Sequence, residues 1–239
     1  MSIELGLSAA AVATAADNVR HFIQRTPLQR SERLSAELGT GVWLKREDLQ
    51  VTRSYKVRGA YNVMSTLEER GRGVVCASAG NHAQGVAISC SVLGIRGRVF
   101  VPSATPRQKR ERIMALGGPR VELVVAGSTY DEAGAAALAA GVDTGAVLVH
   151  PFDDAHVIAG QGTVAVELHE QCPEPFGTVV VPVGGGGLIA GMALWLRERC
   201  PGVRIVGAEP EGASSMRAAL IAGRPVALPT VDTFVDGAA

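Results

Sequence analysis

Short apolar runs alternate with helical patterns along most of the 239-residue chain. Runs of strand length are apolar on both faces, which is typical of parallel strands buried between helices. They occupy 74–77, 98–101, 121–125, 146–150, 178–183 and 203–208, with a shorter candidate at 42–45. Helical patterns cover 8–24, 31–38, 56–70, 82–93, 105–116, 129–140, 155–171, 188–199 and 214–222. This alternation predicts an α/β fold.

The strands divide into two groups, which predicts two lobes, each a mostly parallel sheet covered by helices, with the active site in the cleft between them. We expect the strands within 74–150 to form one sheet, and those at 178–183 and 203–208 to form another together with the N-terminal segment. We therefore predict a small domain over 54–151 and a large domain from 1–53 and 152–239. Residues 223–239 show no helix or strand pattern, so we expect the large domain to be incomplete at its C-terminal end.

Composition narrows the classes of function. Lys and Arg together number 23, as do Asp and Glu, so the formal net charge is zero and lacks the basic excess of most nucleic-acid binders. The basic run 107–112 lies on a helical pattern, which favours a solvated helix face. The four cysteines form no C-x-x-C pair, and no export signal or bilayer-length apolar run is present. We expect a cytoplasmic protein that binds neither membrane nor nucleic acid.

The segment around Lys56 is the first candidate for chemistry. Ser54 stands before the helical pattern and can cap it, which places Lys56 in the first turn. A cation near the positive end of a helix dipole loses its proton more easily, and a partly neutral amine can attack an aldehyde. The alternative is an ordinary surface lysine that opens a helix.

Four consecutive glycines, Gly184, Gly185, Gly186 and Gly187, follow an apolar strand and precede the helix that starts at Leu188. Backbone N–H groups without side chains can converge on one anion, and the helix dipole favours a phosphate there. The stretch has neither P-loop nor G-x-G-x-x-G spacing, so the phosphate should not belong to a nucleoside triphosphate or dinucleotide. The alternative is a flexible turn.

A second turn between strand and helix reads Ser78, Ala79, Gly80, Asn81, His82. Its polar side chains and the free N–H groups of the next helix predict a pocket for a carboxylate. Asn81 can also donate to a ring oxygen, or it can simply cap the helix. His82 can equally be a first-turn residue without a chemical role.

Together, an activated lysine, a phosphate cradle and a carboxylate pocket suggest pyridoxal 5′-phosphate as cofactor. The three stretches, in this order and at these separations, resemble the pyridoxal-phosphate enzymes of the tryptophan-synthase-β fold, and within them the threonine dehydratases (threonine ammonia-lyases). Further support comes from the stretches 44–48, 159–163 and 181–183.

The resemblance implies deamination of L-threonine to 2-oxobutanoate and ammonia by β-elimination of the hydroxyl, as in isoleucine biosynthesis, with L-serine as a weaker substrate. It implies that Lys56 holds the cofactor and moves the α-proton, with Tyr55 beside the ring and Asn81 on its oxygen. It also implies that Gly184–Gly187 and Leu188 hold the phosphate, and that Ser78–His82 bind the substrate. A homo-oligomer is expected.

Departures from the family pattern qualify this expectation. Serine racemases of this fold have a serine where the chain has Ala79, so racemisation should be weak. Glu209 is retained from their divalent-metal site, but Ser215 replaces an aspartate, so we predict no tight divalent site. The residue that faces the pyridine nitrogen is expected beyond residue 239.

Alternatives remain open at this stage. One is a dehydratase of another 3-hydroxy amino acid, such as serine or 3-hydroxyaspartate. Another is a non-catalytic, truncated piece of such an enzyme that keeps the phosphate cradle. A nucleotide-binding oxidoreductase would need a G-x-G-x-x-G turn with an acidic residue about 20 positions on, which the sequence does not contain.

Overall fold

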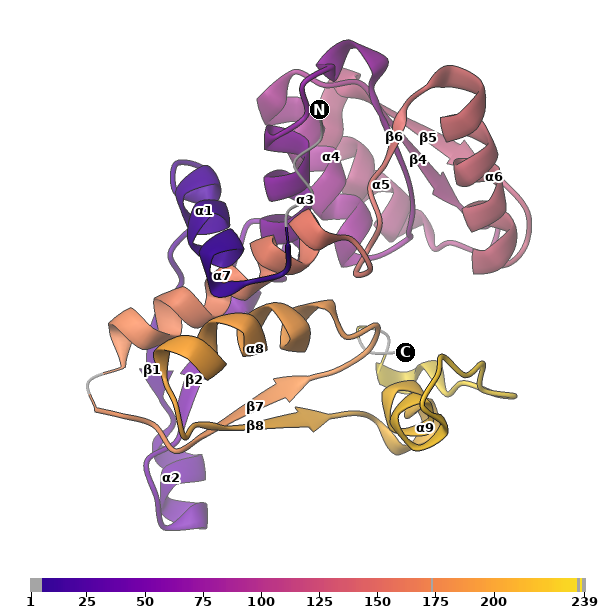
Figure 1. Cartoon of the computed structure of the whole chain (residues 1–239). Coiled ribbons are helices and arrows are strands. Elements are labelled where there is room, and N and C mark those ends of the chain that lie inside the picture. Colours follow the sequence, from indigo (N-terminus) through magenta and orange to yellow (C-terminus); the bar gives the residue numbers. More distant parts are fainter. Residues whose placement is uncertain (1–5, 173, 236, 238–239) are drawn as a thin grey trace.

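The computed structural model describes residues 6–172, 174–235 and 237 and contains helices and strands in alternation (Figure 1). The helices are α1 (Ala9–Val19), α2 (Glu32–Leu38), α3 (Lys56–Ser65), α4 (Asn81–Leu93), α5 (Arg107–Gly117), α6 (Tyr130–Thr144), α7 (Ala155–Gln171), α8 (Gly187–Arg199) and α9 (Ser215–Ala222). The strands are β1 (Leu28–Arg30), β2 (Trp43–Lys45), β3 (Val74–Ala77), β4 (Gly97–Val101), β5 (Val121–Val125), β6 (Val147–Leu148), β7 (Thr178–Pro182) and β8 (Arg204–Ala208).

The largest sheet is fully parallel, with the strand order β5-β4-β3-β6. Helices cover both of its faces, as the double-sided apolar pattern of its strands requires. One core cluster packs residues of α3, α4 and α5 against the sheet, including Met64, Val86 and Ile113. A second cluster packs α6 on the opposite face through Ala133 and Ala137.

A second parallel sheet pairs β7 with β8, and α8 packs beside it (Figure 1). The expectation that the N-terminal segment joins this sheet is wrong for the described residues. There, β1 pairs with β2 in an antiparallel ladder of their own. The strand β1 was not predicted, because Pro27 next to a three-residue strand looks like a helix break in the sequence.

Helix α7 lies between the two parallel sheets and contacts α1, α3 and α8 (Figure 1). Glycines allow this close packing. A Cβ on Gly160 would lie 2.7 Å from the Cα of Gly59 on α3, and one on Gly162 would lie 2.6 Å from the backbone oxygen of Gly191 on α8. Side chains at these positions would push the helices apart.

The predicted boundaries agree closely with the observed ones, and β3, β5 and α7 have the predicted limits. The largest differences are at α1 and α3. Helix α3 ends at Ser65 instead of 70, and a short 3₁₀ helix at Arg70–Arg72 leads into β3. Every helix in the described part of the chain is too short or too polar to cross a bilayer.

Candidate active site

Lys56 is the first residue of α3, and it is half-buried. Its Nζ donates a hydrogen bond of 2.9 Å to the backbone oxygen of Pro151. Burial lowers the pKa of Lys56 to about 8, so the predicted direction is right, although burial is the cause that the structure supplies. Ser54 accepts a 3.2 Å bond from the Lys56 backbone N–H, and the Tyr55 ring centroid lies 5.6 Å from Nζ.

The turn from Ser78 to His82 follows the carboxyl end of β3, as predicted. Helix α4 starts at Asn81 after Gly80, and no side chain caps its first N–H groups. Ser78 Oγ accepts a 3.2 Å bond from the Gly80 N–H, which closes the turn. The Asn81 amide is half-buried and makes no hydrogen bond with any described residue, so the site has both uncapped N–H groups and an amide for a ligand.

The His82 imidazole is buried beneath this turn. Its Nε2 lies 2.9 Å from the backbone oxygen of Val149, and since a carbonyl only accepts, Nε2 carries the proton. Burial lowers the pKa of His82 to about 3, with smaller opposing and reinforcing effects from that bond and from Lys56. His82 is therefore neutral at physiological pH, and its Nδ1 has no partner within the described residues.

The glycine stretch lies at the carboxyl end of β7 and opens α8. Gly186 adopts φ +85°, which an L side chain rarely adopts, and no side chain caps the helix. A Cβ on Gly187 would lie 2.8 Å from the Phe152 backbone oxygen, and one on Gly185 would collide with the Phe152 ring. Glycine is therefore required at these two positions by the packing of Phe152 against the turn.

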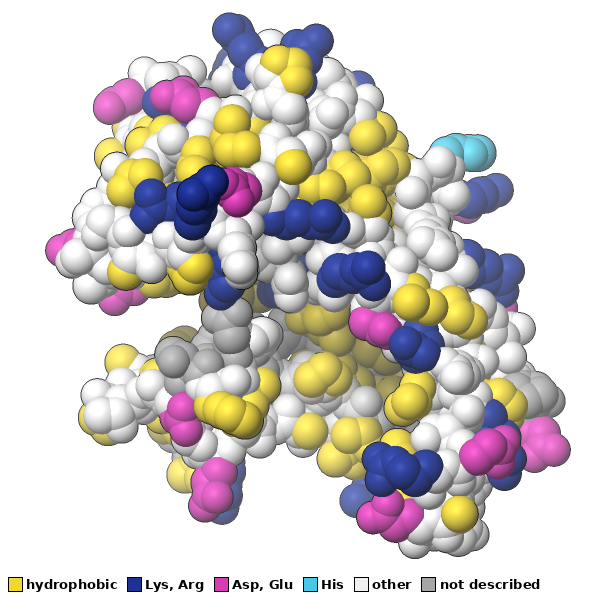
Figure 2. All heavy atoms as spheres, turned by 180° about the vertical axis from the view of Figure 1, so that it is seen from behind, with side chains coloured by type: hydrophobic (Ala, Val, Ile, Leu, Met, Phe, Trp, Pro, Cys, Tyr) yellow, Lys and Arg dark blue, Asp and Glu magenta, His cyan; other side chains and the backbone are white. Residues whose placement is uncertain are grey.

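One segment, 149–152, contacts all three predicted stretches. The Val149 oxygen meets His82, the Pro151 oxygen meets Lys56, and Phe152 lies against Gly185 and Gly187. The hollow between the part that carries β3–β6 and the part that carries β7 and β8 is visible in the space-filling view (Figure 2). Stretches that are about 100 residues apart in the sequence are thus connected through this one short segment.

A sequence model of the family described as "Pyridoxal-phosphate dependent enzyme" matches residues 19–239. The chain belongs to this family. It is 57% identical over 235 residues to the biosynthetic L-threonine dehydratase IlvA of Mycobacterium tuberculosis, covering 98% of this chain and 55% of that protein. The chain therefore spans about half the length of the curated relatives it matches.

Solved structures of family members share the fold. The processed form of threonine deaminase isoform 2 from Solanum lycopersicum superposes with a TM-score of 0.90 at 43% identity, covering 96% of this chain and 63% of that one. Maize serine racemase superposes with a TM-score of 0.91 at 34% identity, covering 97% and 70%. The predicted α/β fold of the pyridoxal-phosphate enzymes is confirmed.

The residues present fit the family's cofactor on grounds of their own. A half-buried lysine with a lowered pKa suits reaction with an aldehyde. The glycine turn leaves its backbone open, and α8 presents its uncapped N-terminus to a phosphate. Asn81 has an unused amide.

A buried ionic network lies behind Lys56 and was missed in the sequence. Arg58, fully buried two residues after Lys56, donates two 2.8 Å bonds to Glu47 and one 2.8 Å bond to Glu167 on α7. Lys45 also pairs with Glu167. Two cations and two carboxylates alternate, so the network is neutral overall and ties the start of α3 to α7.

The sequence analysis did not predict the structural roles of His150, Phe152 and Glu209 either. His150 Nδ1 accepts a 2.7 Å bond from the Asp153 N–H, which shapes the turn after Pro151, and the Phe152 ring lies edge-on to His150. Only the unusual succession His-Pro-Phe after a strand could have indicated that turn. Glu209 accepts 2.8 Å bonds from the Met216 and Arg217 N–H groups, so its carboxylate caps α9.

Proposed function

We propose that this chain carries the lysine, the phosphate cradle and the carboxylate loop of an enzyme that deaminates L-threonine to 2-oxobutanoate and ammonia, with L-serine as a weaker substrate. The observation that carries the proposal is the meeting of Lys56, the Ser78–His82 turn and the glycine stretch around residues 149–152. Relatives named as threonine dehydratases support the choice of substrate.

Each group has a defined task in this proposal. The N–H groups of Gly184–Gly187 and the start of α8 at Leu188 bind the cofactor phosphate. Tyr55 lies beside the lysine, and Asn81 donates its amide to the ring oxygen. The turn Ser78–His82, including Ala79 and Gly80, binds the substrate carboxylate through its uncapped N–H groups. Bound pyridoxal phosphate supplies an electron sink for the substrate's α-carbon.

Lys56 moves the proton. With a pKa of about 8, roughly a tenth of its amine is neutral at pH 7, enough to react with an aldehyde and to accept the α-proton. Loss of that proton and of the β-hydroxyl removes water from threonine. Hydrolysis then returns one water and releases ammonia and 2-oxobutanoate, so that atoms balance.

Neutral His82 suits this site because it adds no second positive charge near Lys56 when the Lys56 amine accepts the α-proton. Its Nε2–H holds the Val149 oxygen and so positions the segment that carries Pro151. Ala79 has a methyl group, which cannot return a proton to the opposite face of the substrate. We therefore propose that elimination dominates over racemisation.

The proposed domains differ in which of the three site stretches they carry. We propose a small domain over 54–151, carrying Lys56 and the carboxylate turn, and a large cofactor-binding domain from 1–53 and 152–239, carrying the glycine stretch. A homo-oligomer and a cytoplasmic location also stay predictions.

The deciding experiment combines the visible absorption spectrum with product analysis. The chain with added pyridoxal phosphate should show a visible band that Lys56→Ala loses and that Lys109→Ala, a matched control on α5, retains. Addition of L-threonine should change the band and release 2-oxobutanoate, with less product from L-serine. A band in Lys56→Ala equal to that of the parent would refute the role of Lys56. A band without any oxo acid would refute the proposed reaction for this chain.

A further inference from the structure

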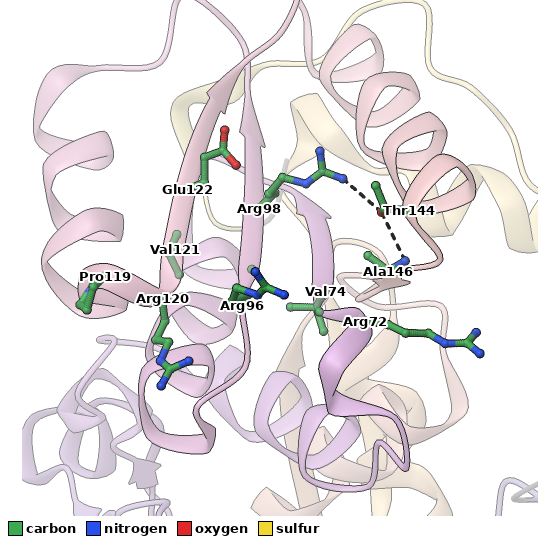
Figure 3. A pocket seen from close by; sticks show the side chains of 12 residues that line it. Arg72, Val74, Arg96, Arg98, Pro119, Arg120, Val121, Glu122, Thr144 and Ala146 are labelled. Atoms are coloured by element: carbon green, nitrogen blue, oxygen red, sulfur yellow. Dashed lines mark hydrogen bonds between the residues drawn. The ribbon is translucent and has the colours of Figure 1, made fainter.

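A cavity of about 380 Å³ lies at the amino ends of the parallel strands, the edge of the sheet opposite to the Ser78–His82 turn (Figure 3). Its polar lining comes from Arg72, Arg96, Arg98, Arg120, Glu122 and Thr144. Four arginines around one cavity are unexpected in a chain whose formal net charge is zero. None of these side chains takes part in the proposed reaction.

The strand register sets two of these arginines side by side. Gly97 of β4 pairs with Val121 of β5, and Arg96 and Arg120 are the residues immediately before them. Neighbouring strands lie about 4.8 Å apart, so the two side chains start from adjacent positions. Like charges at adjacent positions repel unless a counter-charge lies between them.

Two of the four arginines have partners in the described part of the chain. Arg72 pairs with Glu69. Arg98 donates to Thr144 Oγ1 at the C-terminal end of α6 (Figure 3) and to the Ala140 oxygen, at 3.2 Å each. By contrast, the side chains of Arg96 and Arg120 form no hydrogen bond or ion pair with the described residues.

Glu122 is the only carboxylate among the lining residues, and it makes no ion pair in the described part of the chain. Arg98 faces Glu122 in the β4–β5 register. This single carboxylate can balance one of the three arginines Arg96, Arg98 and Arg120, so two positive charges remain unbalanced. Their side chains are at least partly open to solvent, so a ligand from solution can reach them.

We propose that this cavity binds a phosphate-type dianion between Arg96 and Arg120. A guanidinium group offers paired N–H donors that match phosphate oxygens, and a phosphate monoester carries nearly two negative charges at neutral pH. Val74 and Val121 give the cavity an apolar floor, so a small organic group on the phosphate has a surface to contact. The dianion can be free phosphate or a phosphate ester, and the experiment below separates them.

The test reads the backbone amides of Gly73 and Gly97, which line the cavity, in ¹⁵N-labelled protein. Inorganic phosphate and glycerol phosphate are titrated separately, with potassium chloride of equal ionic strength as reference. Both should shift these amides saturably. Tighter binding of the ester assigns the site to an ester and its apolar contact, and equal binding assigns it to the free ion. The amides of Gly185 and Gly187 report on the proposed cofactor-phosphate site. Failure of the proposed function is therefore distinguishable from failure of anion binding at the arginine cavity.

The variant Arg96→Ser/Arg120→Ser should weaken binding at the cavity at least tenfold and leave the pyridoxal-phosphate spectrum unchanged. The control Arg204→Ser/Arg224→Ser removes the same charge from exposed positions on another part of the chain. Equal weakening in both variants would show a general charge effect and overturn the proposal. So would the absence of saturable shifts at Gly73 and Gly97, or shifts that persist unchanged in Arg96→Ser/Arg120→Ser.

Discussion

Removal of the Arg58 side-chain charge should be one of the most destabilising single changes in the protein. The side chain is fully buried, whereas its partners Glu47 and Glu167 retain 13% and 15% of their side-chain exposure. Arg58→Met keeps much of the volume but leaves one buried negative charge in excess. Breaking a buried ion pair costs about 3–5 kcal/mol. Because water can reach both carboxylates, we expect the lower end, about 3 kcal/mol.

The assay is urea unfolding followed by circular dichroism. Domains of ordinary stability unfold at a cost of about 5–15 kcal/mol, so Arg58→Met should still fold but show a clearly lower urea midpoint. Arg33→Ala is the control, because it removes an arginine from an exposed ion pair with Glu37. Its midpoint should change little.

A second variant tests the cause. Arg58→Met/Glu47→Gln removes the excess charge and leaves the Lys45–Glu167 pair in place. It should recover about 1 kcal/mol or more relative to Arg58→Met, because residues in one ionic network are energetically coupled. A loss below about 1 kcal/mol in Arg58→Met, or a double variant less stable than Arg58→Met, would refute the reasoning from charge balance.

Three further predictions concern packing and protonation. Gly191→Ala should destabilise the protein by about 1–3 kcal/mol in urea unfolding, because its Cβ would lie 2.7 Å from the Gly162 nitrogen. The control Gly134→Ala places a methyl group in open space on α6 and should stabilise the protein slightly. The pKa of His82 in the folded protein lies below the unfolded value of about 6.5, so its contribution to the free energy of unfolding is complete above that pH and is lost as pH falls toward about 3. The resulting loss of stability is about 2 kcal/mol by pH 5, and it should be smaller in His82→Gln but unchanged in His21→Gln. Capture of pyridoxal phosphate at Lys56, fixed with borohydride and located by peptide mass, should rise with pH and level off above about 8; a rise that continues toward the ordinary lysine value would contradict the effect of burial.

The sequence by itself determined most of the elements and the positions of the candidate site residues along them. Double-sided apolar runs fixed the parallel strands, and the glycine stretch marked the start of α8, because these properties depend on local pattern and backbone freedom. The short strand β1 was missed, since a three-residue strand gains its stability from its partner β2 and not from its own residues.

Only the tertiary structure decided how these stretches meet. The segment 149–152 contacts Lys56, His82 and the glycine stretch through backbone oxygens and one ring. Because every residue has a backbone oxygen, the sequence cannot indicate such contacts. Likewise, the neutrality of His82 and the lowered pKa of Lys56 result from burial, which is a property of packing. Nothing in the sequence marked Arg58 as buried, because charge pairing across about 100 residues depends on where α7 contacts α3.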